Sequence, residues 1–438
     1  MIPADYIIGG DYVLTMDASL SVIENGAVVV QGDTIADVGP AQIMSERYAA
    51  REVLPGKGKA ILPGLINTHT HAAMVYFRGI ADDLPLNEWL HKHIWPAENT
   101  WLSPSFVGDA VELACIEMAK GGITTYNDMY FFEDAAGEAT KRVGMRAVLG
   151  SGILDFPSVS AQSADQYLEN AKQFVRNWRD DELIVPCIAP HALYTCGTDT
   201  LKKAKTLAEI LQVNLHIHLS ETQWEVGEVM ARHHKRPVEY LADLGFLDES
   251  VLAAHCIWLN DHEIELLAKH RVGVSHCMES NLKLASGFAP VVSMLSAGVK
   301  VSFGTDGAAS NNDLNIFSEM STTAKVHKAL SNDPTALDAK TALLMATRWA
   351  AEVLGLGSMI GSIEGGKRAD LIAIDLHKPH LSPLYNIYSH LVYAVAASDV
   401  DMVMVNGKLL MRDRRLLSVD EEEILRKASG WRQKIQPH

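Results

Sequence analysis

The sequence predicts an α/β protein, a (β/α)8 TIM barrel joined to a small β-sandwich domain that both termini build together. Short apolar runs alternate with longer helical segments from about residue 60 to 360, and strand-like segments occupy both ends of the chain. Polar residues follow nearly every apolar run of the central region. Strands that alternate with helices over such a length are typical of parallel strands connected by crossover helices.

Residues 1–60 indicate the N-terminal part of the sandwich domain. Turn signals at Gly9-Gly10, at 24–26 and at 32–33 separate four expected short strands, which are 6–8, 12–15, 27–30 and 34–38. Clusters of Gly, Asn and Asp between apolar runs are the usual punctuation of such strands.

Residues 61–360 indicate the barrel. Eight apolar runs are candidate strands: 61–67, 123–127, 146–154, 184–189, 213–218, 251–256, 272–276 and 299–303. One connecting helix is well marked, because Ser103 suits the N-cap, Pro104 the first helical position and Gly121-Gly122 the end. An open doubly wound sheet is the alternative, but no Gly-x-Gly-x-x-Gly turn follows an early strand. Eight βα units favour the barrel.

Residues 361–438 return to strands and complete the sandwich domain. Runs at 369–375 and 400–405 read as strands, and Asn406-Gly407 is a typical hairpin turn. A terminal helix follows, for which Ser418 and Glu421 are expected to form a capping box.

Composition limits the partners. The chain has 438 residues and a net charge of −16, which argues against nucleic acid or an anionic membrane but not against a nucleoside-sized ligand. No secretory signal or bilayer-spanning run is visible. The five scattered cysteines suit a reducing cytoplasm, so a cytoplasmic location is expected. They include no Pro-Cys-x-x-Cys run, which excludes a Cys-rich zinc site of the cytidine-deaminase type.

The ends of the expected barrel strands carry residues suited to chemistry. Barrel enzymes place their catalytic groups at the carboxyl ends of strands. His69 and His71 end the first run at a spacing that points both imidazoles to one side of a strand. Neutral histidine is the commonest metal ligand. Other polar residues follow later runs, namely His191, His216, His218, Glu221, His255, His276 and Asp306. Since a buried His or Asp without a partner is costly, their recurrence indicates a site.

These residues resemble the amidohydrolase superfamily, whose pattern is matched by 63–71, His218, His255 and Asp306. Within it, the chain is most similar to the 5′-methylthioadenosine/S-adenosylhomocysteine deaminase family. The resemblance covers essentially the whole chain and rests on the motifs Phe77-Arg78-Gly79, Leu84-Pro85-Leu86, His93-Ile94-Trp95-Pro96-Ala97-Glu98, Asp128-Met129-Tyr130-Phe131, Glu279-Ser280-Asn281-Leu282-Lys283-Leu284 and 304–312.

The resemblance implies one divalent metal per chain, usually zinc, bound by His69, His71, His218 and Asp306. Three imidazoles and a carboxylate suit zinc with a position left for water, and iron or manganese can replace zinc in such a site. Dinuclear relatives carry a bridging modified lysine at the end of strand four. The segment 184–190 contains no lysine, which favours a single metal. His216 lies deeper on the strand of His218, and we interpret it as a packed core histidine.

The resemblance also implies that Glu98 and His191 contact the substrate, Glu98 by accepting hydrogen bonds from ribose hydroxyls. Glu221 and His255 would flank the reacting centre, and Glu221 and Asp306 would also contact the substrate.

The expected reaction is hydrolytic deamination of 5′-methylthioadenosine, S-adenosylhomocysteine or adenosine. The metal would generate a hydroxide at neutral pH. His255 and Asp306 would hold that water and take its proton, while Glu221 protonates ring nitrogen one of the purine as carbon six is attacked. Ammonia leaves, and a hypoxanthine nucleoside remains.

Several alternatives stay open. A guanine, cytosine or triazine hydrolase would share the metal site. A catalytically silent metal-binding scaffold is another reading, but it would need neither Glu221 nor His255. Arg142 and Arg146 either meet the amino-acid carboxylate of S-adenosylhomocysteine or are ordinary surface bases. His276 holds either His255 or the following loop. The oligomeric state is undetermined, although barrels of this family often pair.

Overall fold

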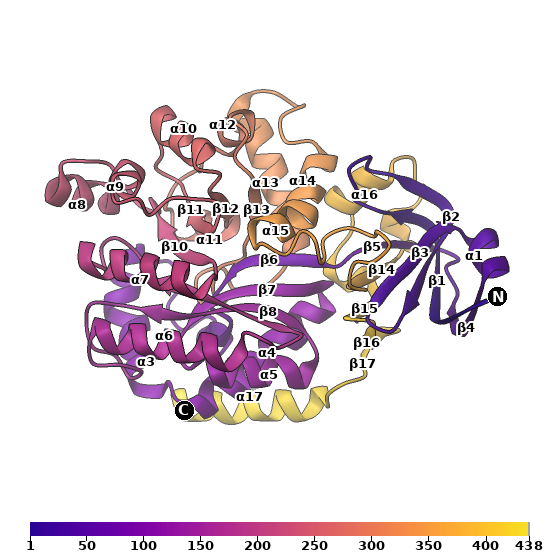
Figure 1. The fold of residues 1–438 in the computed structure, drawn as a ribbon, viewed down its shortest axis with the longest axis horizontal. Helices are drawn as coiled ribbons and strands as arrows, with labels where there is room; N and C mark the ends of the chain where they lie inside the picture. The colour runs from indigo at the N-terminus through magenta and orange to yellow at the C-terminus, as the bar shows by residue number, and fades with distance from the viewer. Residues whose placement is uncertain (437–438) are drawn as a thin grey trace.

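The strands of the protein form an eight-stranded parallel barrel and a nine-stranded mixed sheet, as the computed structural model of residues 1–436 shows (Figure 1). The barrel is nearly closed, and the mixed sheet draws its strands from both ends of the chain. The predicted architecture is therefore confirmed. Among residues 1–436, no helix combines the length and the apolar character that crossing a bilayer requires.

The barrel strands lie in sequence order, and each pairs in parallel with the next. They are β6 (Leu65–Thr70), β7 (Ile123–Tyr130), β8 (Arg146–Ile153), β9 (Ile184–Pro190), β10 (Leu215–Leu219), β11 (Val251–His255), β12 (Gly273–His276) and β13 (Val301–Phe303). Because all of them run in one direction, their carboxyl ends meet at one face of the barrel.

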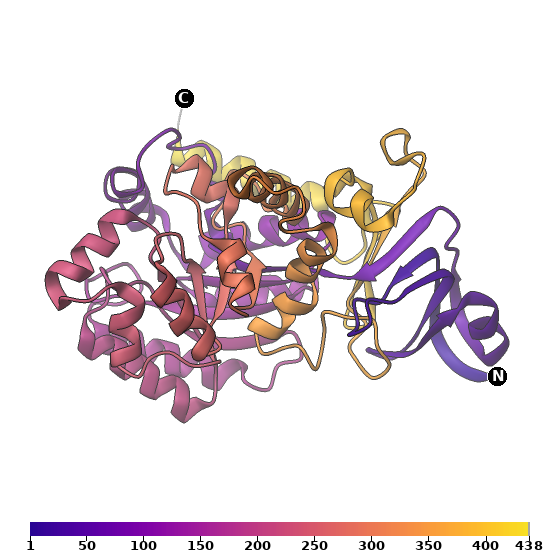
Figure 2. The same ribbon diagram turned by 90° about the horizontal axis from the view of Figure 1, so that it is seen from above.

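Helices surround the barrel, as the view from above shows (Figure 2). They are α4 (Pro104–Lys120), α5 (Glu133–Val143), α6 (Ala164–Trp178), α7 (Thr198–Leu211), α8 (Gln223–His233), α9 (Pro237–Asp243), α10 (Asp261–Lys269), α11 (Met278–Lys283), α12 (Val291–Ser296), α13 (Ile316–Ser331), α14 (Ala339–Ala346) and α15 (Arg348–Val353). Helix α4 begins as predicted, because the Ser103 side chain accepts a hydrogen bond from the backbone N–H of Phe106.

A chain of short helices connects β6 to α4. It comprises the 3-10 helix η1 (Ala72–Phe77), α2 (Leu86–Glu88), the π-helix η2 (Trp89–Ile94) and α3 (Trp95–Trp101). Single turns of π-helix are rare and often occur at functional sites. The connection is therefore a candidate wall of a binding site.

The mixed sheet joins the two ends of the chain through β5 (Lys59–Pro63), which pairs in antiparallel fashion with β14 (Leu371–Asp375). Its other strands are β1 (Ile2–Leu14), β2 (Val22–Gln31), β3 (Thr34–Pro40), β4 (Tyr48–Leu54), β15 (Val400–Val405), β16 (Lys408–Arg412) and β17 (Arg415–Leu416). Asn406 and Gly407 join β15 to β16 with φ angles of 50° and 73°, which confirms the predicted hairpin turn.

Five further helical elements accompany the mixed sheet and the end of the described chain. They are α1 (Ala41–Arg47), η3 (Pro379–Leu381), α16 (Ile387–Tyr393), η4 (Ala397–Asp399) and α17 (Glu421–Ile435). Helix α17 returns along the barrel (Figure 1), where Lys427 Nζ lies 2.8 Å from Glu112 Oε2 of α4.

The expected turns at 24–26, which lies inside β2, and at Gly9-Gly10 are wrong. Both glycines lie inside β1, and Gly10 pairs with Gly26 in the ladder with β2. A Cβ at Gly10 would lie 2.8 Å from Ile61 Cγ1. The glycines therefore allow neighbouring chain segments to approach closely and do not reverse the chain.

Two other expected local features differ from the structure. The apolar run 61–67 is not one strand, because β5 ends at Pro63 and β6 begins at Leu65 in the other sheet. Both flanks are buried, so no polar residue marks the break. The terminal helix is capped by Asp420, whose carboxylate accepts hydrogen bonds from two backbone N–H groups, and not by Ser418. Ser418 instead donates to the carbonyl of Val143.

Arg146 connects the barrel to the mixed sheet. It is therefore neither a contact for the amino-acid carboxylate of a substrate nor a surface base. It opens β8, and its side chain is fully buried, as is that of its partner Asp370. Nε donates to Asp370 Oδ2 at 2.8 Å, and Nη2 lies 3.2 Å from Oδ1. The same guanidinium also donates to Asn406 Oδ1 and to the carbonyl of Glu182. Arg142 is half exposed on α5 and donates to Glu112.

Replacing Arg146 with methionine should lower the free energy of unfolding by about 3–5 kcal/mol, because Asp370 would stay buried without its counter-charge. Urea unfolding of the purified variant measures this loss. The matched control is Arg142→Met, since Glu112 keeps Lys427 as a partner and an exposed ion pair contributes less than about 1 kcal/mol. Equal losses in the two variants would contradict the assigned role of Arg146.

Candidate active site

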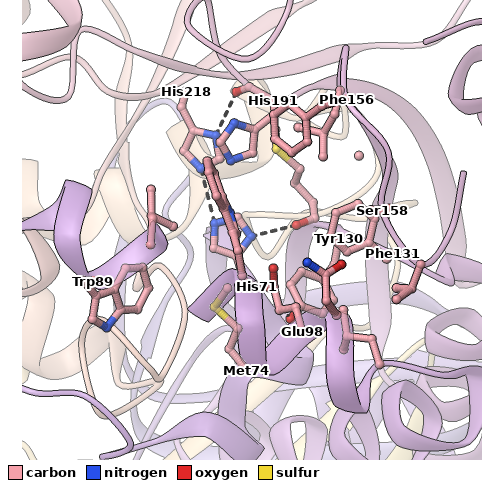
Figure 3. Close-up of a pocket in the computed structure, with 18 of the residues that line it drawn as sticks. His71, Met74, Trp89, Glu98, Tyr130, Phe131, Phe156, Ser158, His191 and His218 are labelled. Carbon is pink, nitrogen blue, oxygen red and sulfur yellow. Dashed lines mark hydrogen bonds between the residues drawn. The ribbon is translucent and has the colours of Figure 1, made fainter. Parts of the chain in front are cut away.

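A cavity of about 310 Å³ opens at the carboxyl face of the barrel (Figure 3). Most of its lining is apolar, and many of its polar side chains are ones that the sequence analysis singled out. They include His71, Glu98, His191, His218, Glu221, His255 and Asp306. Seven residues predicted from separate motifs therefore share one cavity.

His71 and His218 face each other through their Nε2 atoms, which lie 3.2 Å apart. Each Nδ1 lies against a backbone carbonyl, that of Met129 at 2.7 Å and that of His191 at 2.8 Å. A carbonyl oxygen can only accept, so both Nδ1 atoms carry the proton. In the neutral rings the two Nε2 lone pairs then point at each other, an arrangement that a cation between them would stabilise.

His69 lies beside His71 and is fully buried, and burial lowers its pKa to about 4. Its Nδ1 lies 2.9 Å from Nε2 of His216, while its own Nε2 has no hydrogen-bond partner among residues 1–436. The predicted core histidine is therefore buried, as expected, but it also orients a candidate ligand. A buried ring nitrogen that is left unpaired fits a metal ligand.

Asp306 completes the donor set. Its Oδ1 lies 3.5 Å from Nε2 of His69 and 3.4 Å from Nε2 of His71, too far for hydrogen bonds. Ligand atoms lie within 4.8 Å of one another in two overlapping groups, one of His69, His71 and Asp306 and one of His69, His218 and His255. Imidazoles with one carboxylate suit zinc, so these residues fit the metal that the sequence implies.

The backbone at these strand ends is unusual. His255 and Asp306 have φ angles of 71° and 62°, in the left-handed region that favours glycine. Such conformations are costly and cluster at functional sites. Gly304 allows the last strand to approach the first, because a Cβ there would lie 2.6 Å from the Cβ of His69.

Glu221 and His255 form a second pair beside the ligand cluster. His255 Nε2 lies 3.9 Å from Glu221 Oε2, and both side chains are buried. Burial raises the pKa of Glu221, and the nearby charge of His255 opposes this only in part. For His255, burial lowers the pKa, but the carboxylates of Glu221 and Asp306 outweigh it and raise the pKa overall. In both groups of the pair the pKa is therefore raised, that of Glu221 by burial and that of His255 by the neighbouring carboxylates.

Helix α11 holds both His255 and Asp306. Asn281 Oδ1 lies 3.0 Å from Nδ1 of His255, and Ser280 Oγ donates to Asp306 Oδ2 at 2.7 Å. Glu319 of α13 accepts a hydrogen bond from the backbone N–H of Met278, at the first residue of α11. Two consecutive residues of one short helix therefore position two candidate catalytic groups.

Glu98 lies on the cavity wall, on helix α3. It is buried, and burial raises its pKa to about 7, although the hydrogen bond from Tyr130 opposes the increase. The Tyr130 hydroxyl lies 2.6 Å from Glu98 Oε1. A carboxylate placed in an otherwise apolar wall is suited to accept hydrogen bonds from ligand hydroxyls.

His191 lies at the opposite side of the cavity from Glu98 (Figure 3). Its Nδ1 lies 3.0 Å from the Thr195 hydroxyl. Burial, aided by the charge of His71, lowers the pKa of His191 to about 3, so the ring is neutral at physiological pH. A neutral imidazole can donate or accept one hydrogen bond to a ligand.

Of the remaining candidate residues, some line the cavity and others lie outside it. Trp89 and Trp95 line the cavity, whereas Phe77 is a core residue outside it. His276 packs against His327, with ring centroids 5.7 Å apart. Since Asn281 is the partner of His255, the suggestion that His276 holds His255 is wrong.

Sequence reasoning missed Tyr130, Ser280 and Asn281 as site residues. All three stand in motifs that the family resemblance had already marked, 128–131 and 279–284. Tyr130 also ends a barrel strand, which was the available signal.

Two deaminases are similar to this chain over nearly its whole length. A 5-methylthioadenosine/S-adenosylhomocysteine deaminase from Thermodesulfovibrio yellowstonii is 53% identical over 432 residues, which cover 98% of each chain. A 5′-deoxyadenosine deaminase from Methanosarcina acetivorans is 45% identical over 427 residues, which cover 97% of each chain.

A solved structure and a family model are also similar to this chain over most of its length. The protein is similar to the crystal structure of an adenosine deaminase from Xanthomonas campestris with bound zinc, with a TM-score of 0.98, 42% identity and 99% of each chain covered. The model of the amidohydrolase family matches residues 60–410, about four-fifths of the chain. This chain belongs to the amidohydrolase family.

Proposed function

We propose that this protein is a metal-dependent aminohydrolase that converts adenine nucleosides into hypoxanthine nucleosides and ammonia. The substrate class comprises 5′-methylthioadenosine, S-adenosylhomocysteine, 5′-deoxyadenosine and adenosine, as the names of its relatives suggest. The observation that carries the proposal is the buried pair of Glu221 and His255, 3.9 Å apart beside a cluster of metal ligands.

His69, His71, His218 and Asp306 would hold one zinc ion, and iron or manganese would also suit these donors. A metal bound there supplies Lewis-acid chemistry, because it makes water a nucleophile at neutral pH. The protein's own contribution is to fix the tautomers. Backbone carbonyls keep the protons of His71 and His218 on Nδ1, so both Nε2 atoms stay free for the ion.

Glu221 and His255 would handle the protons. Glu221 would donate a proton to ring nitrogen one of the purine, and burial, which raises its pKa, favours the protonated form that this role needs. His255 donates from Nδ1 to Asn281, which leaves Nε2 to accept the proton of the attacking water together with Asp306. Leaving ammonia then needs one further proton, which this imidazolium can supply, and the carbon-six hydroxyl gives its proton back to the Glu221 carboxylate as the carbonyl forms.

The cavity wall would bind the remainder of the nucleoside. Glu98 would accept hydrogen bonds from the ribose hydroxyls, and His191 would contact the purine side of the ligand. Trp89, Trp95 and Leu90 provide apolar surface for the ring system.

Glu98 also favours a nucleoside over a free base or a triazine. A buried carboxylate costs free energy, which a ligand with hydroxyl groups can recover and a ligand without them cannot. A non-catalytic scaffold accounts neither for Glu98 nor for the pairing of Glu221 with His255.

The proposal is tested on one purified sample by metal analysis and an ultraviolet assay with ammonia detection. We expect about one metal per chain. We also expect turnover of at least one of the adenine nucleosides and no turnover of guanine. Treatment with a chelator should abolish turnover, and added zinc should restore it. Turnover of guanine alone would replace the nucleoside by a base substrate, and a metal-loaded protein inactive on every amine would support the scaffold.

Glu221→Gln should lower kcat by about 10²–10⁴-fold, because an amide cannot donate an acidic proton. The metal content should not change, since Glu221 is not among the proposed ligands. The matched control is Glu228→Gln on the exposed side of α8, which should keep wild-type kcat. Full activity of the Glu221 variant would remove this residue from the proton transfer.

Glu98→Gln tests ribose binding through its pH dependence. The ionised carboxylate is the binding form, and its pKa is about 7, so wild-type kcat/KM should fall as the pH drops through 7. The Glu98 variant should lose this acidic limb together with about 10–100-fold of its efficiency at pH 8, as expected for hydrogen bonds to a charged group.

Glu225→Gln is the control for this pH profile, because burial also raises the pKa of Glu225 to about 7. If the acidic limb disappears in the Glu225 variant and persists in the Glu98 variant, the assignment to Glu98 is refuted.

A further inference from the structure

We propose that the Tyr130 hydroxyl is the positioning group for Glu98 and sets the orientation in which its carboxylate accepts the hydroxyls of a sugar. This inference rests on the proposed function, since it requires a ligand with a ribose. Tyr130 acts through Glu98 and does not itself take part in the reaction.

The two residues come from different parts of the fold and meet at the cavity. Tyr130 ends barrel strand β7, whereas Glu98 lies on α3 in the connection that follows β6. The Tyr130 hydroxyl donates to Glu98 Oε1 at 2.6 Å, and both side chains line the cavity while being more than nine-tenths buried. Among residues 1–436, no other group donates a hydrogen bond to the Glu98 carboxylate. The orientation of the carboxylate therefore depends on Tyr130.

Tyr130 is itself held firmly. Its backbone N–H donates to Glu133 Oε1 at 2.9 Å. Its ring lies beside that of His71, with centroids 6.1 Å apart, and beside that of Phe131. Figure 3 shows Tyr130, His71 and Glu98 in the same part of the cavity. The hydroxyl thus fixes Glu98 relative to a candidate metal ligand, so it sets the spacing between the two ends of a bound nucleoside.

The hydrogen bond from Tyr130 leaves acceptor positions on the Glu98 carboxylate free for the hydroxyls of a sugar. An ionised carboxylate offers roughly four acceptor positions, of which the Tyr130 hydroxyl takes one. Oε2 and the second position of Oε1 remain for two neighbouring hydroxyls. Without Tyr130, a side chain with three rotatable bonds would have no protein donor to hold it in this geometry, and a sugar would have to bear that ordering cost.

The test compares adenosine with 2′,3′-dideoxyadenosine in Tyr130→Phe, which keeps the ring and removes the hydroxyl. With adenosine, KM should rise about tenfold or more, the effect of one hydrogen bond to a charged group, while kcat stays near the wild-type value. With the dideoxy nucleoside, the variant and the wild type should be alike. The acidic limb of kcat/KM with adenosine should also move to higher pH, because the lost hydrogen bond stabilised the ionised carboxylate.

The matched control is Tyr126→Phe. Tyr126 lies on the same strand, is fully buried and donates or accepts a bond at 2.5 Å with the Thr140 hydroxyl, away from the cavity. The Tyr126→Phe variant should change neither the ratio of the KM values for the two substrates nor the acidic limb of the pH profile of kcat/KM. The double variant Tyr130→Phe/Glu98→Gln should bind adenosine no more weakly than Glu98→Gln alone.

Two results would overturn the inference while the proposed function stands. An equal loss with both nucleosides would mean that Tyr130 acts on the purine or on folding, and an unchanged KM with adenosine would mean that Glu98 needs no positioning. A wild-type protein that turns over no nucleoside would instead refute the proposed function, and the role of Tyr130 with it.

Discussion

The return of the last barrel strand to the first is the constraint on which the site depends. The backbone N–H of Asp306 donates to the carbonyl of His69 at 2.9 Å. Just before it, the Asn67 side chain bonds the backbone and the hydroxyl of Thr305. These contacts join two segments more than 200 residues apart. The only protein carboxylate proposed as a metal ligand reaches the histidines because of this closure.

The closure also explains how one small cavity holds two carboxyl groups with opposite tendencies. For Asp306, burial raises the pKa, but the imidazoles of His69 and His71 outweigh it and hold the pKa well below its usual range. For Glu221, the charges of His255 and His71 oppose the effect of burial only in part, so burial prevails. The pKa of one carboxyl group is thereby lowered and that of the other is raised. Environments that separate two such groups are a recognised route to acid and base roles in one site.

The sequence predicted the parts of this site that follow from local pattern. His69 and His71 share a strand face because of their spacing, and Asp306 follows an apolar run, so both could be placed at strand ends before any contact was known. The barrel itself follows from the alternation of strands and helices. Partners across long sequence separations were not predictable in this way. Arg146 looks like a surface base because nothing near it in sequence reveals Asp370.

The same limit applies to the residues that orient the site. Asn281 and Tyr130 are uncharged and carry no spacing signal of their own, and their roles appear only when α11 and α3 are brought against the strand ends. The local errors have a related cause. Gly9-Gly10 has the composition of a turn, yet the glycines serve close packing, which depends on the neighbouring strand and not on the glycines themselves.

Under the proposed function, the arrangement of polar groups in the cavity would account for the selectivity of the site. The cavity is lined by the proposed metal ligands His71, His218 and Asp306, by the pair of Glu221 and His255, by Glu98 with Tyr130, and by aromatic and aliphatic side chains. A flat apolar ring with a reactive edge and neighbouring hydroxyls would satisfy these polar groups at once. A ligand that lacks either the edge or the hydroxyls leaves buried polar groups without partners, which costs more than the lost contact alone. Rejection of incomplete ligands therefore follows from burial of the polar groups, whereas the apolar wall supplies general affinity.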